Sequence, residues 1–357
     1  MFIYLSQLAF AAPTMLDETD LPETQELELH PAERVSPDQI INGEDAPDGL
    51  FPSAGAMLMT GTVFGQNLET FVCSSTLIAP DVVMLAAHCL DDAAFTFGLG
   101  EVVNKRVYWT RQADLQEWNG STPSPQLPED AIEAAAWSIH EGFDLMSMEI
   151  GIAENDDIAL LFLAEAIDET SPALLPTAEE SQMISEGDNV DVVGWGQSLA
   201  TGQFETPPPG TFAIRQYGTS TIARLGPAEF QVGALETDVR KCHGDSGGPS
   251  YWEGPDGIRV IGVTSHAFDE SDCFETGGVD TRVDHYFSWI DEQMQSACED
   301  GTRVWCEEPG ILLPPADDNL DGEEENGKLF GCNNAPAKQP LMLWLMPLLA
   351  LMLGRRR

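Results

Sequence analysis

The glycine-rich segment Gly244-Asp245-Ser246-Gly247-Gly248-Pro249 carries a serine in surroundings that suit nucleophilic chemistry. A serine hydroxyl attacks a carbonyl carbon when a neighbouring base takes its proton and hydrogen-bond donors stabilise the resulting oxyanion. Glycines let the backbone come close to a bound molecule, so the N–H groups of Gly244 and Ser246 can converge on one oxygen. A serine among glycines is by itself more often an ordinary turn, so the interpretation needs a base and a carboxylate elsewhere.

Two upstream residues supply that base and that carboxylate. His88 ends one apolar run, and Asp157 opens another. Taken singly, a histidine on an apolar segment is usually a satisfied core residue, and an aspartate at a strand edge is usually a cap or turn residue. Taken with Ser246, His88 can act as a general base and Asp157 can orient it. Asp156 is adjacent, but the register before Ile158 favours Asp157.

Apolar runs of strand length lie around these residues. They occupy residues 82–88, 158–163, 190–196 and 260–265. They are partly β-branched and are separated by turn-forming residues, which predicts an all-β domain of the sandwich or barrel type. Residues 109–130 are polar and rich in proline, so we expect a surface loop there. Residues 284–294 are expected to form an amphipathic terminal helix.

In the chain order His, Asp, Ser, these segments resemble the trypsin-like (chymotrypsin-fold) serine peptidases. The match covers roughly residues 40–294. Its further landmarks are Ile40-Ile41-Asn42-Gly43, Gly194-Trp195-Gly196, Ser265, Gly277-Gly278-Val279 and Trp289-Ile290. The resemblance implies an all-β fold of two six-stranded antiparallel β-barrels with a short C-terminal helix, and an active site in the cleft between the barrels.

The resemblance also implies a role for each catalytic residue. Ser246 is expected to be the nucleophile, His88 the general base and then the general acid, and Asp157 the residue that orients His88. The N–H groups of Gly244 and Ser246 are expected to form the oxyanion hole. This chemistry requires no metal and no organic cofactor, and its substrates are proteins or peptides.

Activation is implied by the same family pattern. The α-amine of Ile40, once an activating protease has freed it, is expected to pair with Asp245 and to shape the oxyanion hole. The residue before Ile40 is Gln39, whereas many family zymogens are cut after arginine or lysine.

The substrate pocket departs from the family pattern at several positions. The position at the base of the pocket, two residues before the cysteine of Cys-x-Gly-Asp-Ser, is Arg240, and Lys241 follows it. A positive floor predicts cleavage after Glu or Asp, because a substrate carboxylate can pair with a buried guanidinium. The alternative is that Arg240 turns to solvent or pairs with Asp238 or Asp280. The other expected pocket residues are Ser265, His266, Ala267 and Gly278, where His266 and Ala267 replace the usual aromatic residue and glycine.

The seven cysteines suggest three pairs and one singleton. The resemblance implies a disulfide between Cys73 and Cys89, beside the expected catalytic histidine. We also expect Cys242 to pair with Cys273 and Cys298 with Cys306, although the last pair lies outside the family match. No CxxC pair has metal-ligand spacing, so no metal site is expected. Pairing of this kind indicates an oxidising compartment.

The charge balance narrows the possible partners. The chain has 60 acidic and 16 basic residues, a formal net charge of −44. Such a polyanion is repelled by nucleic acid and by anionic lipid surfaces, so no nucleic-acid partner is expected. We interpret the charge as a device for solubility. A hydrophobic content of 43% is ample for a packed core.

Both ends of the chain resemble targeting segments. Residues 1–12 resemble a signal peptide, or alternatively a buried N-terminal strand or helix, and residues 13–39 an acidic propeptide. The peptidase domain is expected at residues 40–295 and an acidic linker at 296–331. Asp317–Asp321 have the oxygen spacing of calcium loops, but Lys328 stands at the twelfth position, so we favour an acidic spacer.

Residues 332–357 combine Cys332, a short apolar stretch and three terminal arginines. This arrangement resembles the C-terminal sorting signals of myxobacterial surface proteins, in which the cysteine is the processing site. It predicts a secreted protein anchored at the bacterial cell surface, with a tail that contacts the membrane and sorting machinery. The alternative is an ordinary single-span anchor, for which the stretch is short.

Two other functions compete with peptide hydrolysis. One is a non-catalytic protease homologue that acts as a surface-binding module, but such homologues commonly lack a catalytic residue, and none is missing here. The other is a structural adhesin tethered by the tail, which would not require the Gly244–Ser246 turn.

Overall fold

Apolar runs and tight turns build two antiparallel barrels along the chain. The computed structural model describes residues 40–47, 49–119, 122, 124–199, 208–269 and 273–306. The expected leader and tail, residues 1–39 and 307–357 with Cys332, lie outside the described residues. No helix in the described ranges is long and apolar enough to cross a membrane.

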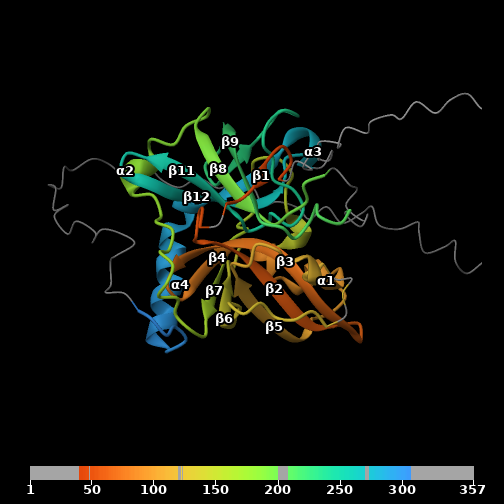
Figure 1. Ribbon diagram of the computed structural model, residues 1–357. Coiled ribbons are helices and arrows are strands. Elements are labelled where there is room, and N and C mark those ends of the chain that lie inside the picture. The colour runs from red at the N-terminus through yellow and green to blue at the C-terminus, as the bar shows by residue number, and fades with distance from the viewer. Residues whose placement is uncertain are drawn as a thin grey trace, which may run out of the picture. The chain divides into compact units, whose positions relative to one another are not determined.

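The first half of the domain folds into a closed barrel, drawn in orange and yellow in the lower part of Figure 1. Its neighbouring strands run in the order β2-β3-β4-β7-β6-β5, and pairing of β2 with β5 closes it. The strands are β2 (Ala54–Val63), β3 (Gln66–Ala79), β4 (Val82–Leu85), β5 (Val103–Thr110), β6 (Ile132–Ile139) and β7 (Ala159–Leu163). Every residue of β4 and β7 is buried, which explains why these runs lack polar alternation.

The second half forms the second barrel, in green and teal above the first (Figure 1). Six strands follow the order β9-β10-β13-β12-β11-β8, and the pairing of β8 with β9 closes them into a barrel. They are β8 (Asn189–Gly194), β9 (Gln216–Leu225), β10 (Glu229–Val232), β11 (Pro249–Gly254), β12 (Gly257–Ala267) and β13 (Gly278–Arg282). A short strand, β1 (Glu44–Asp45), adds to the edge of β9. The predicted architecture of two six-stranded barrels is confirmed.

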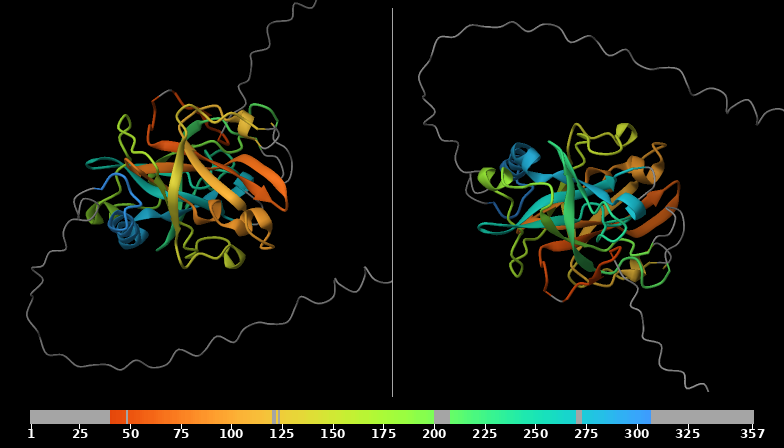
Figure 2. Two further views of the ribbon diagram at one scale, coloured as in Figure 1. Left: turned by 90° about the horizontal axis from the view of Figure 1, so that it is seen from below. Right: turned by 90° about the horizontal axis from the view of Figure 1, so that it is seen from above.

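Short helices lie between the strands, and one longer helix follows the last strand. They are η1 (Ala87–Cys89), α1 (Asp92–Thr96), η2 (Gln116–Trp118), η3 (Leu145–Ser147), α2 (Ala178–Ser181), α3 (Cys273–Thr276), η4 (Val283–Tyr286) and α4 (Phe287–Glu299). Figure 2 shows α4, in blue, at the outside of the barrels. Its apolar residues Trp289, Ile290 and Met294 join the core of the first barrel. Each such side chain stabilises the fold by about 1.5–3 kcal/mol when fully buried.

Two sequence boundaries need correction. Residues 109 and 110 do not belong to a surface loop, because Trp109 and Thr110 end β5 and are buried. The terminal helix continues to Glu299, and the segment after it is tied back by a disulfide between Cys298 and Cys306. The expected linker therefore cannot begin at residue 296, since the folded unit includes the residues up to Cys306.

Candidate active site

The pairing of β4 with β7 brings His88 and Asp157 together. Leu85, the last residue of β4, pairs with Ala159, the first residue of β7. The residues just after β4 and just before β7 therefore meet at the same end of the first barrel. His88 Nδ1 lies 2.8 Å from Asp157 Oδ2, and the His88 backbone N–H donates to Asp157 Oδ1 at 2.9 Å.

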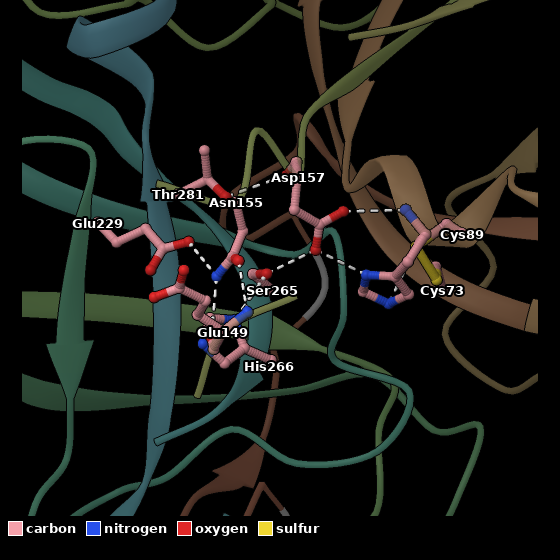
Figure 3. Close-up of polar contacts among 10 residues, drawn as sticks. Cys73, Cys89, Glu149, Asn155, Asp157, Glu229, Ser265, His266 and Thr281 are labelled. Atoms are coloured by element: carbon pink, nitrogen blue, oxygen red, sulfur yellow. Dashed lines mark hydrogen bonds and ion pairs between the residues drawn. A yellow bond between two sulfur atoms is a disulfide. The ribbon is translucent and has the colours of Figure 1, made fainter. Parts of the chain in front are cut away.

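Asp157 is fully buried and accepts hydrogen bonds from both barrels. Besides His88, the Ser265 hydroxyl donates to Asp157 Oδ2 at 2.5 Å, and the Thr281 hydroxyl donates to the Asp157 main-chain oxygen at 3.0 Å (Figure 3). Burial works to raise the pKa of Asp157, but the charge of His88 and the bonds from His88 and Ser265 hold it below the ordinary value. Asp157 is therefore a carboxylate. Asp156 faces elsewhere and accepts from the Tyr286 hydroxyl.

His88 is a stronger base than an ordinary histidine. Burial lowers its pKa, yet the charge and hydrogen bond of Asp157, with a further contribution from Asp91, raise it above the usual value. The side chain keeps 19% of its surface exposed, so the ring reaches solvent. Its Nε2 lies 3.9 Å from Cys89 Sγ, an atom that is already committed to the disulfide with Cys73.

Ser246 and His88 line the same cavity, which has a volume of about 400 Å³. The Ser246 hydroxyl makes no hydrogen bond within the described part of the chain. The other described lining residues are Leu145, Met148, Lys241, Cys242, His243, Thr264, Ser265, His266, Ala267, Asp269 and Gly278. The cavity thus combines a serine hydroxyl, a basic histidine and room for a side chain.

The turn around Ser246 leaves two backbone donors available. Gly244 has φ +93°, a left-handed conformation that favours glycine, and a Cβ there would come within 2.8 Å of Phe212. The Gly244 carbonyl accepts from the Ser74 N–H at 3.2 Å and from the Ser74 hydroxyl at 3.0 Å. In the described ranges, neither the Gly244 nor the Ser246 N–H donates a hydrogen bond. Both remain able to bind an oxyanion.

Asp245 lies buried directly behind this turn. Its carboxylate accepts from the Gly196 N–H at 2.8 Å and from the Cys242 N–H at 2.9 Å. Burial raises its pKa to about 6, although these two bonds work in the opposite direction. Ile40 is also fully buried, in the core of the second barrel, with φ +39°. A β-branched residue is strained in this region of the φ/ψ map.

The charged residues before the nucleophile differ from the expected pocket. Arg240 does not line the cavity; its Nη2 donates to the Glu236 carbonyl at 3.2 Å, while Nε and Nη1 have no partner. Lys241 does line it, but its ammonium lies 2.6 Å from both oxygens of Asp280 and 2.9 Å from the Ser250 hydroxyl. Lys241 and Asp280 are both fully buried. The Arg240 guanidinium therefore points away from this cavity and the Lys241 ammonium is neutralised, so the preference for Glu or Asp stays a prediction.

Sequence reasoning missed several residues around Asp157. Asn155 and the buried Glu229 hydrogen-bond to each other at 3.0 Å (Figure 3). The Gly151 carbonyl contacts His266. Glu229 stands in a strand whose four residues are all buried. A lone glutamate in such a run was the available signal, but its partner lies 74 residues away in the chain.

The disulfides lie at the edges of the site and of the domain. Cys73 pairs with Cys89 at an S–S distance of 2.03 Å, which attaches the His88 segment to β3, and Cys298 pairs with Cys306. Cys242 is disulfide-bonded as well. The side chain of Cys273, its expected partner, lies outside the described residues.

Comparison with known proteins agrees with this arrangement. The family profile named Trypsin matches residues 40–290. The chain is 30% identical over 236 residues to CLIP domain-containing serine protease HP8 of Bombyx mori, and the match covers 62% of this chain and 61% of the relative. It is 26% identical over 271 residues to human Kallikrein-4, and that match covers 72% of this chain and 89% of the relative. The chain thus spans about three fifths of the length of the Bombyx mori relative.

A solved structure of HL collagenase has the same fold. Its TM-score is 0.51 at 23% identity, and the match covers 71% of this chain and 98% of the collagenase chain. Since the family profile covers well over half of the sequence, the chain belongs to the trypsin family of serine endopeptidases.

Proposed function

We propose that this protein hydrolyses peptide bonds through an acyl-enzyme on Ser246, with His88 as base and Asp157 as the orienting carboxylate. The observation that carries the proposal is the buried Asp157 carboxylate, which binds His88 Nδ1 beside the cavity that also holds Ser246. This contact places the Nδ1 proton toward Asp157, so His88 Nε2 is the basic nitrogen. It also stabilises the imidazolium that forms during the reaction.

The steps follow from these positions. The Ser246 hydroxyl gives its proton to His88 Nε2 while its oxygen bonds to the substrate carbonyl carbon, and the N–H groups of Gly244 and Ser246 bind the oxyanion. His88 then returns the proton to the leaving nitrogen as the C–N bond breaks. Water gives a proton to His88 and attacks the acyl carbon, and the Ser246 oxygen leaves with that proton.

Activation is proposed to require a cut between Gln39 and Ile40 by another protease. In the uncut chain the Ile40 nitrogen is an amide and cannot neutralise Asp245, whose pKa burial raises to about 6. The φ angle of Ile40 is +39°, which is strained for a β-branched residue. This angle describes rotation about the N–Cα bond directly after the 39–40 peptide, so cutting that peptide removes the restriction on it. The new α-amine would supply the charge that Asp245 lacks.

The substrate residue before the cut is proposed to be uncharged. Lys241 is the only lysine or arginine among the described lining residues, and Asp280 already binds it. Arg240, whose Nε and Nη1 have no partner, lies outside the cavity lining, and a preference for Glu or Asp would be favoured if its guanidinium turned inward. Matched peptides that differ only in Leu, Glu or Arg before the cut distinguish these cases: faster cleavage after Glu would reject the uncharged preference.

Secretion and attachment to the cell surface through Cys332 remain proposals. The disulfides at Cys73–Cys89 and Cys298–Cys306 support an oxidising compartment. Mass spectrometry of Cys332 in protein recovered from cell envelopes tests the sorting role. A disulfide at Cys332 in the mature protein would exclude that role.

Replacement of Ser246 by alanine is the decisive test of the activity. Peptidase turnover of the Ser246→Ala protein should fall by about 10⁶-fold, because the nucleophile is lost while the oxyanion hole remains. Labelling by a fluorophosphonate should disappear as well. The exposed Ser185→Ala is the matched control and should retain full turnover and labelling. Normal turnover of Ser246→Ala would favour a binding module over an enzyme.

A further inference from the structure

His266 occupies the end of β12 beside the triad, and both of its ring nitrogens have partners. Nδ1 lies 2.9 Å from the oxygen of the Ser265 hydroxyl, and both residues are labelled in Figure 3. Nε2 lies 3.0 Å from the Gly151 carbonyl oxygen. Ser265 is the residue that donates to Asp157. His266 is therefore one hydrogen bond removed from the group that orients His88.

The protons in this chain of bonds can be assigned from chemistry. The Asp157 carboxylate only accepts, so the single hydroxyl proton of Ser265 points to Asp157. The Ser265 oxygen must then accept from His266, which requires a proton on Nδ1. The Gly151 carbonyl also only accepts, which requires a proton on Nε2. With both nitrogens protonated, His266 is an imidazolium cation.

A buried carboxylate balances this charge. Glu229, on β10, is 1% exposed and accepts from the Ala153 N–H at 2.8 Å and from the Asn155 side chain at 3.0 Å. Burial raises the pKa of Glu229, while the Ala153 bond and the charge of His266 work to lower it. His266 thus lies between two carboxylates, Asp157 through Ser265 and Glu229 through space.

Other ionisable groups face the same cavity. They are His88 at the end of the first barrel, Lys241 and His243 before the nucleophile, and Asp269 after β12. Lys241 is already paired with Asp280. His266 differs from His88, whose ring must be neutral to act as base, because both ring nitrogens of His266 face acceptor atoms.

The loop that His266 contacts leads directly to Asp157. The Asn155 side chain accepts from the Glu149 N–H at 2.8 Å and donates to the Glu149 carbonyl at 3.1 Å, which closes residues 149–155 into a compact loop. His266 holds this loop at Gly151, and Glu229 holds it at Ala153 and Asn155. Asp157 lies two residues after Asn155. Ser265 therefore holds Asp157 directly through its hydroxyl, and His266 holds it indirectly through the 149–155 loop.

We propose that His266 is a positioning residue that acts as an imidazolium through Ser265 and Gly151 to hold Asp157 and the 149–155 loop, with Glu229 as its counter-ion. This inference rests on the proposed catalytic role of Asp157. A side chain that offers only one of these two donors cannot keep both the Gly151 and the Ser265 contacts, so the loop or Asp157 would lose its support.

The protonation state can be measured without any change at His266. Full-length Ser246→Ala protein labelled with ¹⁵N-histidine gives long-range ¹H–¹⁵N spectra that separate imidazolium from neutral rings. One histidine should carry two protonated nitrogens throughout the pH range in which the unmutated protein is active. That signal should vanish in the additional variant His266→Gln. A neutral His266 ring in this pH range would overturn the proposal.

Kinetics test the positioning role. His266→Gln retains polar atoms but no charge, and its kcat should fall about tenfold with a much smaller change in KM, as for loss of a coupled contact. The double variant with Glu229→Gln should lose less than the product of the two single losses, because each single change leaves an unpaired charge. Equal kcat in folded His266→Gln would also overturn the proposal.

The controls separate this inference from the proposed function. Arg106 is an exposed cation of the first barrel that pairs with Glu133 outside the cavity lining, and Arg106→Gln should leave kcat and KM unchanged. If Ser246→Ala retained activity, the catalytic assignment would fail, while the ¹⁵N spectra would still report on His266. If Ser246→Ala were inactive and His266→Gln fully active, only the positioning role would fail.

Discussion

Asp157 is the residue that connects the groups of this site from both barrels. Its two side-chain oxygens and its main-chain oxygen accept bonds from His88, Ser265 and Thr281, so it is held by both barrels. A buried carboxylate without such partners would be strongly disfavoured. The same bonds that make its burial tolerable also fix the ring of His88 in the orientation that a general base needs.

Replacing Asp157 by asparagine should therefore change both rate and pH dependence. The pKa of His88 is raised largely by Asp157, and the base must be neutral, so activity appears only as pH rises through that raised pKa. Asp157→Asn should lower kcat by about 10⁴-fold and move the acid limb of kcat/KM to lower pH. The pH profile of kcat/KM measures both effects.

Asp156→Asn is the matched control for that change. Asp156 lies next in the chain but contacts Tyr286 and His140. It should keep the position of the acid limb and most of the rate. If Asp156→Asn proved as damaging as Asp157→Asn, the roles of the two aspartates would have to be reassigned.

At the scale of elements, the segment after α4 is bound to the first barrel by a buried ion pair. Arg303 Nε and Nη2 donate to Asp81 Oδ1 at 3.0 and 2.7 Å. Asp81 Oδ2 accepts from the N–H groups of Val304 and Trp305 at 2.9 and 2.8 Å. Asp81 lies in the turn between β3 and β4, so this contact joins the last described segment to the strands that lead to His88.

Asp81→Asn should lower the free energy of unfolding by about 3–5 kcal/mol, because it removes the buried carboxylate charge that pairs with the Arg303 guanidinium. Urea unfolding of the Ser246→Ala background measures this change without autolysis. The matched control is Glu133→Gln, which breaks the exposed pair with Arg106 and should leave stability nearly unchanged. Equal effects of the two changes would mean that the buried pair contributes no more than a surface pair.

At the scale of the whole molecule, the two barrels each contribute part of the site. His88 and Asp157 come from the first barrel, and Ser246, Ser265 and the buried Asp245 come from the second. Under the proposed activation, the charge of the buried Asp245 is the component that a cut before Ile40 would control.

This arrangement predicts a pH dependence of stability that the activation cut should abolish. The folded-state pKa of Asp245 is about 6, above the value of about 3.9 for an unfolded aspartate, so the uncut protein should lose stability as pH rises from about 4 to 6. The loss corresponds to about 3 kcal/mol. After cleavage between Gln39 and Ile40, the free amine should pair with Asp245 and remove this loss.

Chemical unfolding of uncut and cut Ser246→Ala protein at pH 4 and 7.5 measures the difference. Uncut protein with Asp245→Asn serves as the control, since it has no group to ionise and should lack the decline. An uncut chain that cleaves peptides at the full rate, or a cut chain with an unchanged pH dependence, would contradict this role of Ile40.

The sequence by itself determined that this is an all-β domain, and its resemblance to the trypsin-like peptidases implied the two barrels. Apolar runs of strand length, such as those that form β4 and β7, predict buried strands because their side chains face apolar surroundings on both sides of the sheet. The glycine-rich turn at Ser246 and the residues at the strand ends, His88 and Asp157, were visible because local spacing reflects local geometry. Family resemblance then supplied their order and expected roles.

Tertiary structure alone decided how the charges are paired. Lys241 forms an ion pair with Asp280, which is 39 residues away in the sequence. Asn155 hydrogen-bonds to Glu229, 74 residues away, and Ser265 to Asp157, 108 residues away. Such contacts depend on which strands become neighbours when a barrel closes and on where the two barrels meet, and no local periodicity encodes them. For this reason Arg240 was expected in the cavity although its guanidinium points to the Glu236 carbonyl. The proposed charge of His266 can be inferred only from its two hydrogen-bond partners, because the groups around a histidine determine which of its ring nitrogens carry a proton.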